Sequence, residues 1–455
     1  MISLRFTVLL AFLIASTQAA PPSVEKSIPV RIEQTPKGWR LLRDGLPYFV
    51  KGACVWGENV RASDLKDAGA NSLRTYHSKY ARWTLDAAQR RGMTVMLGYE
   101  ISGHHEGFSY LDPGDVKRQR ERFLEFVRKY KNHPALLVWA IGNEVEQNVQ
   151  PAFAEAMWKE LNELARLTRE IDPDHPTAIV LAGAPDEKLQ AVRAWCPDVD
   201  LICINSYKGL RDLPEHLAKN DWKKPYLITE FGAVGWWEAP VTAWGAPIEM
   251  TSTEKAKEYL TSYQRGIRRD RPHCLGSYVF FWEPKQEATS TWFGLFLSGG
   301  ERLEMIDAMT QAWSGRKPRN RCPQIKTLEF AGGRGHFFPG DLVEVKLAAS
   351  DPERDPMGVS WRIMEESPPF TPENGYQSVP RALLEHSIVP RDDGAQFPAP
   401  AKPGAYRIFV FVYDGNGNAA TGNLCFFVDA IPPAPSPTPT PAPPAPQPEG
   451  EPTPP

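Results

Sequence analysis

Short apolar runs alternate with amphipathic stretches between about residues 30 and 317. Eight of these runs have the length and composition of buried parallel strands: 48–54, 72–76, 94–99, 136–142, 177–181, 201–205, 225–229 and 276–282. One intervening stretch places apolar residues at helical spacing, at Val116, Phe123, Phe126, Val127 and Tyr130. The alternation predicts an α/β fold, a (β/α)₈ TIM barrel over residues 27–317. In such a barrel the reactive groups lie at the C-terminal ends of the strands.

The pattern changes after the predicted barrel. From residue 321 to 430, apolar and polar positions alternate with a period of two, in runs such as 341–348, 359–364 and 406–413. Turns rich in Pro, Gly and Asp join these runs, so the segment is predicted to be a small, all-β, Ig-like sandwich. It has no concentration of catalytic residue types, which favours an accessory role.

Both ends of the chain are predicted to lie outside the folded domains. Residues 1–20 contain Arg5, an apolar run and a small-residue stretch, which is typical of a signal peptide and predicts a secreted or periplasmic protein. That apolar run is too short for the roughly 20 residues of a spanning helix, and no other segment is long enough. Residues 431–455 contain thirteen of the 44 prolines and are predicted to form a disordered spacer, which could attach the protein to a cell surface.

Charge and cysteine usage narrow the possible partners. The formal net charge is −3 without a long basic run, so neither nucleic acid nor an anionic membrane surface is expected as a partner. The six cysteines show no metal-ligand spacing, and Cys322 and Cys425 are the favoured candidates for a disulfide. The run 104–106 (HHE) follows the third predicted strand, where His105 is expected to contact substrate. No metal and no organic cofactor is expected.

Two of the predicted strands end in a glutamate. One apolar strand stops at Gly142, followed by Asn143 and Glu144, and a second ends at Glu230. Acetal cleavage needs one protonated carboxyl group to assist the leaving oxygen and one ionised carboxylate at the anomeric carbon. Each glutamate taken alone is better explained as a strand-end cap or an ion-pair partner. Together, at one end of one barrel, they predict a catalytic pair.

These stretches resemble known glycosidase motifs. Residues 132–144 read NHPALLVWAIGNE and resemble the acid/base motif of glycoside hydrolase family 2 barrels. Residues 228–232 read ITEFG and resemble the nucleophile motif of the wider clan A of retaining glycosidases. The resemblance implies that Glu144 is the acid/base, that Asn143 lies beside it, and that Glu230 is the nucleophile.

Four further positions agree with that clan, and a loop tryptophan, Trp237, is a separate candidate for contact with substrate. Arg74 ends the second strand, where a cation can hydrogen-bond the nucleophile. Asn205 and Tyr207 end the sixth strand, where the clan often places a tyrosine near the nucleophile. Trp282, at the end of the eighth strand, and Trp237, on a loop, could stack on sugar rings. The alternatives are an ordinary ion pair for Arg74, core packing for Tyr207 and Trp282, and lid packing for Trp237.

Two departures leave the family open. Family 2 enzymes normally carry β-sandwich domains ahead of the barrel, whereas the predicted sandwich here follows it. Residues 74–77 (RTYH) also resemble fungal family 72 β-1,3-glucanosyltransferases. The sequence therefore predicts a secreted retaining β-glycosidase acting on a β-linked oligo- or polysaccharide, with its carboxyl groups about 5–5.5 Å apart. The alternatives are a β-glucanosyltransferase acting on cell-wall or extracellular glucan and a non-catalytic carbohydrate-binding surface protein.

Overall fold

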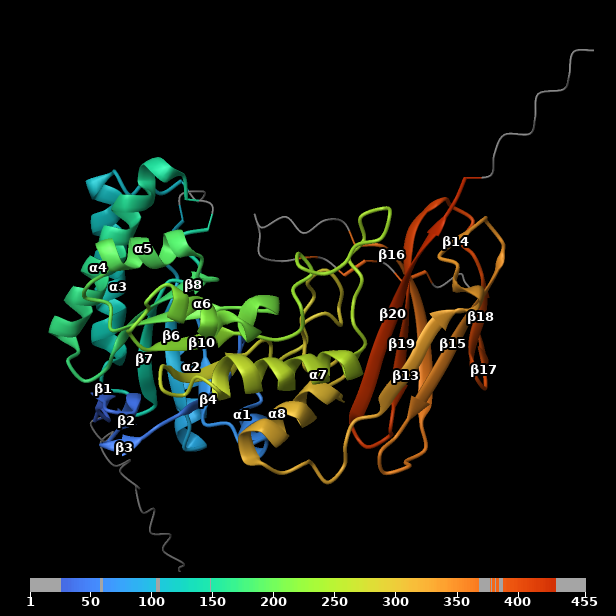
Figure 1. Ribbon diagram of the computed structural model, residues 1–455, viewed down its shortest axis with the longest axis horizontal. Coiled ribbons are helices and arrows are strands. Elements are labelled where there is room, and N and C mark those ends of the chain that lie inside the picture. Colours follow the sequence, from blue (N-terminus) through green and yellow to red (C-terminus); the bar gives the residue numbers. More distant parts are fainter. Residues whose placement is uncertain are drawn as a thin grey trace, which may run out of the picture.

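The computed structural model describes residues 26–57, 60–103, 107–147, 149–367, 377, 379–380, 382–383 and 388–430. The predicted signal peptide, the proline-rich tail and His105 lie outside these residues and stay predictions. Figure 1 shows two regions along the longest axis, an α/β region and a region of long antiparallel strands. In the described part of the chain, no helix has the length and apolar character needed to span a bilayer.

Eight parallel strands close into a barrel in the order β10-β11-β4-β5-β6-β7-β8-β9. Their bounds are Val50–Cys54 (β4), Ser72–Arg74 (β5), Thr94–Tyr99 (β6), Leu136–Ile141 (β7), Thr177–Ala182 (β8), Leu201–Asn205 (β9), Tyr226–Glu230 (β10) and Cys274–Val279 (β11). Each predicted strand corresponds to one of them, so the TIM barrel is confirmed. The prediction succeeded because both faces of a parallel strand are buried, which leaves a nearly continuous apolar run.

Helices cover the outside of the barrel. Their bounds are Ala62–Asp67 (α1), Ala81–Arg90 (α2), Pro113–Tyr130 (α3), Pro151–Ile171 (α4), Asp186–Trp195 (α5), Leu213–Lys219 (α6), Ser252–Ser262 (α7) and Glu304–Ser314 (α8). Helix α3 begins at Asp112, whose carboxylate accepts hydrogen bonds from two backbone amides of the first turn. Its buried face includes Phe123, Phe126, Val127 and Tyr130, as predicted.

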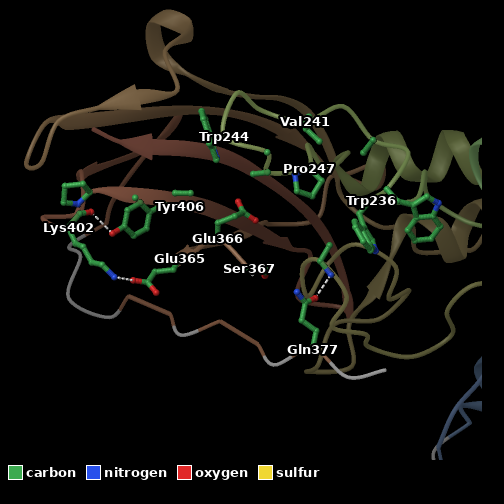
Figure 2. Close-up of a pocket in the computed structure, with 18 residues that line it drawn as sticks. Trp236, Val241, Trp244, Pro247, Glu365, Glu366, Ser367, Gln377, Lys402 and Tyr406 are labelled. Atoms are coloured by element: carbon green, nitrogen blue, oxygen red, sulfur yellow. Dashed lines mark hydrogen bonds and ion pairs between the residues drawn. The ribbon is translucent and has the colours of Figure 1, made fainter. Parts of the chain in front are cut away.

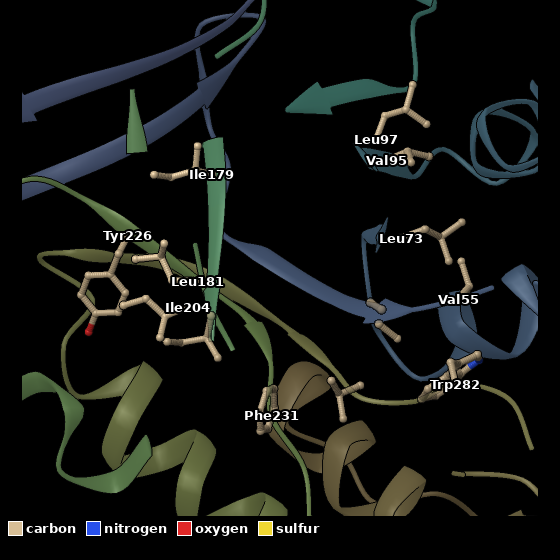
Figure 3. Packing of buried hydrophobic residues seen from close by; sticks show 14 of the residues in the cluster. Val55, Leu73, Val95, Leu97, Ile179, Leu181, Ile204, Tyr226, Phe231 and Trp282 are labelled. Carbon is tan, nitrogen blue, oxygen red and sulfur yellow. The ribbon is translucent and has the colours of Figure 1, made fainter. Parts of the chain in front are cut away.

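The largest apolar core lies between the strands and this helical layer (Figure 3). Leu73, Val95, Leu97 and Ile179 project outward from neighbouring strands and are almost completely buried. Burial of each such side chain is worth roughly 1.5–3 kcal/mol, so this layer holds the barrel closed. The strand ends at the rim are thereby fixed, which is what a catalytic constellation on those ends requires.

A small antiparallel sheet precedes the barrel. It was not predicted from the sequence. It consists of Val30–Thr35 (β1), Gly38–Arg43 (β2) and Leu46–Pro47 (β3). Val30 and Leu41 from this sheet join the buried cluster that contains the barrel-interior residues Val50 and Leu137. The barrel interior is therefore filled at the end opposite the predicted site.

The C-terminal region contains two sheets that share buried side chains. One has the order β12-β20-β19-β16, with β14 paired to β20, and the other has the order β13-β15-β18-β17. The bounds are Arg302–Leu303 (β12), Gln324–Phe330 (β13), His336–Phe337 (β14), Leu342–Ser350 (β15), Gly358–Glu365 (β16), Val389–Arg391 (β17), Gly394–Pro398 (β18), Gly404–Tyr413 (β19) and Asn418–Val428 (β20). Val345, Ile363, Phe397 and Phe426 belong to one apolar cluster formed by both sheets.

The C-terminal sheets pack directly on the barrel. Strand β12, which precedes α8, pairs with β20, so one sheet includes chain from both regions. A buried ion pair between Lys255 of α7 and Glu249 lies at this junction, and Asn423 of β20 donates to Glu249 at 2.7 Å. Because both charged groups are almost completely buried, their pairing is needed to offset the loss of hydration.

The disulfide predicted between Cys322 and Cys425 is wrong. Both thiols are free, and each lies against a different backbone carbonyl: Cys322 Sγ is 3.3 Å from the oxygen of Arg302, and Cys425 Sγ is 3.8 Å from that of Pro247. The two residues occupy different places in the structure, because Cys322 lies in the linker between α8 and β13 and Cys425 lies in β20.

Candidate active site

A sharp turn after β7 places Glu144 at the barrel rim. Gly142 has a φ of 73°, and a Cβ atom at this position would lie 2.3 Å from Cγ2 of Val145, so only glycine fits. Glu144 itself has a φ of 51°, which is uncommon for a residue with a side chain. Its amide donates to the carbonyl of Val180 at 2.9 Å, which holds this strained backbone in place.

The Glu144 carboxyl group is poised to act as an acid. Asn205 Nδ2 donates to Oε1 at 2.7 Å, and Gln147 Nε2 donates to Oε2 at 2.9 Å. Burial, followed by the nearby charge of Glu230, raises the pKa of Glu144 to about 7, while the hydrogen bond from Asn205 opposes the rise. Glu144 therefore keeps its proton up to near-neutral pH.

Glu230, the last residue of β10, has a different environment. Arg74 Nη1 donates to Oε1 at 2.9 Å, and the Tyr207 hydroxyl donates to Oε2 at 2.8 Å. Both the Arg74 and the Glu230 side chains are almost completely buried. The guanidinium group is permanently cationic, so it offsets the negative charge of the Glu230 carboxylate and fixes its orientation.

A chain of amide groups connects the two glutamates. Arg74 Nη2 donates to Asn143 Oδ1 at 2.5 Å, and Asn205 Nδ2 donates to the same oxygen at 3.2 Å. Thr229, next to Glu230, donates its hydroxyl proton to Asn205 Oδ1 at 2.8 Å, which orients that amide. The structure thus brings together Arg74, Asn143, Asn205 and both glutamates in one hydrogen-bonded network.

The network opens onto a cavity of about 1030 Å³ at the C-terminal ends of the barrel strands. Six of the predicted site residues line it: Asn143, Glu144, Asn205, Tyr207, Glu230 and Trp237. Arg74 lies behind Glu230 rather than on the cavity wall. Trp237 is 52% exposed and meets Tyr207 edge to face, with ring centroids 5.3 Å apart. An exposed indole beside the carboxylates is suited to stacking on a sugar ring.

The stacking role predicted for Trp282 is wrong. Its side chain is completely buried and packs with Phe296 and Trp313, at centroid distances of 5.6 and 6.1 Å. Phe280 and Phe281 follow β11 and line the cavity in place of Trp282. A cis peptide bond joins these two residues. Trp282 therefore faces the helical layer, in the core-packing role that was its alternative.

Several lining residues were not selected from the sequence. Trp56 follows β4, Tyr76 follows β5, and Lys285 and Glu287 follow β11. Trp56 is 52% exposed, and its ring centroid lies 5.6 Å from that of Tyr76. All four come shortly after a barrel strand, so their position relative to strand ends was an available signal. Gln147, which lies between β7 and α4, also lines the cavity, and the same signal could have identified it.

A TIM barrel with two glutamates in different surroundings at the ends of β7 and β10 resembles the site of a clan A glycoside hydrolase. Residues 52–273 match the sequence family described as "Glycosyl hydrolases family 2, TIM barrel domain". Over these residues the barrel therefore resembles the TIM-barrel domain of family 2 glycoside hydrolases.

The similar proteins include several β-glucuronidases. The chain is 26% identical over 278 residues to the β-glucuronidase of Paenibacillus borealis, covering 54% of this chain and 44% of that protein. It is 32% identical over 200 residues to that of Streptococcus agalactiae, covering 37% and 31%. The chain thus spans less than half the length of these relatives.

The fold also has a counterpart among solved structures. A calcium-binding mutant of Bacteroides uniformis beta-glucuronidase 2 superposes with a TM-score of 0.51 and 15% identity. The superposition covers 88% of this chain and 48% of the other chain. At this level of identity the similarity concerns the fold.

Proposed function

We propose that the protein is a β-glycosidase that retains anomeric configuration through double displacement. The observation that carries this proposal is the pair of carboxyl groups in one cavity with opposite electrostatic surroundings. Glu144 has a raised pKa of about 7, and Glu230 is paired with the buried Arg74. This division between proton donor and anionic nucleophile is what the first step of glycoside cleavage requires.

In the first step, a Glu230 oxygen forms a bond to the anomeric carbon while the bond to the glycosidic oxygen breaks. Glu144 transfers its proton to that departing oxygen, so the leaving group departs as a neutral alcohol. Arg74 and Tyr207 hold the Glu230 carboxylate by one hydrogen bond to each oxygen, which limits its rotation during the attack. The result is a glycosyl ester on Glu230 and an ionised Glu144.

In the second step, Glu144 removes a proton from water, and the water oxygen displaces Glu230 from the anomeric carbon. Ester formation has removed the negative charge of Glu230, which after burial is the largest cause of the raised pKa of Glu144. The pKa of Glu144 therefore falls in the intermediate, which suits its change from acid to base. Two displacements at one carbon restore the β configuration.

The charges of the cavity favour a neutral sugar. Besides the two catalytic glutamates, the lining includes Glu238, Glu287 and Asp212. Lys285 is the one lysine or arginine among the described lining residues, and its ammonium group lies 3.2 Å from a carboxylate oxygen of Glu287. A uronic acid carboxylate would have to compete with Glu287 for this cation and would meet several like charges.

A panel of aryl β-glycosides tests this function. The wild-type protein is expected to cleave one of the neutral β-glucosides, β-galactosides or β-mannosides with a kcat/KM at least roughly tenfold above that for the β-glucuronide. NMR during the first turnovers should show the β anomer as the first product. An α anomer would contradict double displacement, and products longer than the substrate would identify a transglycosidase. Absence of turnover on every substrate would favour a non-catalytic binding protein.

A second cavity extends the binding surface toward the C-terminal sheets. It has a volume of about 590 Å³ and shares Trp236 and Trp237 with the catalytic cavity. Figure 2 shows its wall, in which Trp244 lies across from Tyr406, and a Glu365–Lys402 ion pair lies below. Aromatic faces combined with polar groups are suited to sugar chains. This continuity supports an oligo- or polysaccharide as the substrate.

Replacement of Trp244 by alanine checks that extension. The substitution is expected to raise KM for long oligosaccharides by about two- to tenfold, because one aromatic contact is worth roughly 0.5–1.5 kcal/mol. The kinetic constants for an aryl monoglycoside should remain unchanged, since that substrate does not reach the second cavity. Trp83→Ala, at an exposed position of α2, is the matched control. An equal loss on short and long substrates would show that Trp244 acts on the fold instead.

The remaining sequence predictions complete the proposal. We infer that the C-terminal sheets form an Ig-like accessory domain that contributes one wall of the second cavity. The composition of residues 1–20 and 431–455 supports export and a proline-rich spacer that can attach the protein to a cell surface. An enzyme that acts on extracellular polysaccharide would benefit from both.

A further inference from the structure

Three aspartates meet at one end of the C-terminal sheets. Asp351 and Asp355 lie in the connection from β15 to β16, and Asp414 follows β19 directly. One carboxylate oxygen from each residue lies within 4.8 Å of the others. Asp351 is 8% exposed and Asp414 is 3% exposed, so two of the three carboxylates are buried.

No positive charge neutralises this cluster within the described residues. None of the three aspartates forms an ion pair there, and the nearby Arg321 is paired with Glu353 at 2.8 Å. The groups that donate to the cluster are neutral: Asn320 and Asn418 donate to Asp414, and Asn416 donates to Asp355. Three negative charges at this spacing repel one another strongly when they are shielded from water.

One carboxylate oxygen of the cluster has no hydrogen-bond donor. Oδ1 of Asp351 accepts from the backbone amides of Glu353 and Asp355, at 2.8 and 3.0 Å. Oδ2 of Asp351 is buried and accepts no hydrogen bond from any residue that the structure describes. A buried carboxylate oxygen without a donor costs several kcal/mol, so native proteins rarely leave one in this state. A buried oxygen without a hydrogen-bond donor is what is expected where the oxygen binds a cation.

We propose that Asp351, Asp355 and Asp414 bind a calcium ion. The donors are all oxygen atoms, which hard divalent cations prefer, and their total charge exceeds that of one Ca²⁺ ion. Two oxygens on opposite sides of Ca²⁺, each at about 2.4 Å, are about 4.8 Å apart, so the cluster fits around one ion. Mg²⁺ requires shorter distances and a strict octahedron, which a cluster on two loops satisfies less well.

The ion would join three segments that are distant in the sequence. Asp351 and Asp355 belong to one loop, and Asp414 begins the turn between β19 and β20. Asn320, in the linker between α8 and β13, donates to Asp414 Oδ2 at 2.8 Å. Asn418, the first residue of β20, pairs with Arg302 of β12. Calcium binding would therefore stabilise the junction between the barrel and the C-terminal sheets.

Calorimetric titration of the full chain after chelator treatment tests the proposal. Addition of CaCl₂ is expected to show one site with a Kd of about 10⁻⁴ M and to raise Tm by about 3–5 °C at millimolar calcium. MgCl₂ should bind at least about tenfold more weakly. Absence of heat and of any Tm change at 10 mM CaCl₂, roughly a hundredfold excess over that Kd, would overturn the proposal.

Asp355→Asn separates metal binding from a structural role. The variant can still accept the hydrogen bond from Asn416, but it removes one negative charge. Its Tm in chelator should equal or exceed that of the wild type, whereas its Tm in calcium should be lower and its affinity at least about tenfold weaker. Asp392→Asn, an exposed acid of the same region, should behave as the wild type does. Equal destabilisation of the Asp355 variant with and without calcium would contradict the proposed site.

Discussion

Replacement of Glu230 by alanine is expected to lower kcat by about 10⁴-fold or more, because removal of a covalent nucleophile leaves only binding and proton transfer. Azide, which fits the space left by the carboxylate, should restore turnover and yield the α-glycosyl azide. The configuration of that product tests the assignment directly, since azide then attacks from the face that Glu230 occupies. The measurement is product analysis by NMR together with steady-state kinetics.

The control for this variant addresses folding. In the alanine variant, the buried guanidinium of Arg74 loses its hydrogen bond to Glu230 and keeps those to Asn143 and to the Thr229 carbonyl. Glu230→Gln is the milder change, because the glutamine oxygen can still accept a hydrogen bond from Arg74. Circular dichroism of both variants should match the wild type, and Glu121→Gln, on the exposed face of α3, should keep full activity. Substantial residual activity in both Glu230 variants with native circular dichroism would reject Glu230 as the nucleophile.

Replacement of Glu144 by glutamine is expected to change the pH dependence as well as the rate. The proton on Glu144 is required for the first step, and its pKa is raised to about 7. In the wild type, kcat/KM should therefore fall as pH rises through about 7, because the acid is lost on the alkaline side. The glutamine variant cannot ionise, so this alkaline limb should disappear.

The leaving group provides the second readout for Glu144. The variant should lose about 10³-fold in kcat/KM on poorly activated aryl glycosides but less than about tenfold on dinitrophenyl glycosides, which depart without a proton. Azide should rescue the second step in the Glu144→Ala variant and yield the β-glycosyl azide. An unchanged alkaline limb or an equal loss on all leaving groups would show that another residue supplies the proton.

The calcium proposal depends on contacts that no single segment reveals. Asp351 and Asp414 are separated by four strands in the sequence, β16 to β19, and meet only because β16 and β19 pair in antiparallel register, Gly358 with Tyr413. The cysteines and histidines, which are the usual metal-ligand types in a sequence, show no spacing that would form one metal site. The sequence alone does not distinguish these aspartates, because acidic residues in loops between strands are common and are usually hydrated.

Site residues on barrel strands were predictable, whereas those on loops were less so. Asn143, Glu144, Asn205 and Glu230 each follow or end an apolar run, and parallel closure of a barrel places all such ends at one rim. The outward turn of Trp282 could not be predicted, because alternation of side chains stops where a strand ends. Phe280 and Phe281, which precede Trp282 in the chain, line the cavity instead.

The sequence by itself determined the barrel, the two glutamates at its strand ends and the change to antiparallel strands after residue 321. These features follow from local patterns of apolar residues, which burial imposes on each strand separately. The tertiary structure alone decided which charges and rings become neighbours. It paired Arg74 with Glu230, raised the pKa of Glu144, kept the thiols of Cys322 and Cys425 apart, and gathered three aspartates around one point. Those outcomes depend on distances between segments far apart in the chain, and such distances are set only when the strands pair and pack.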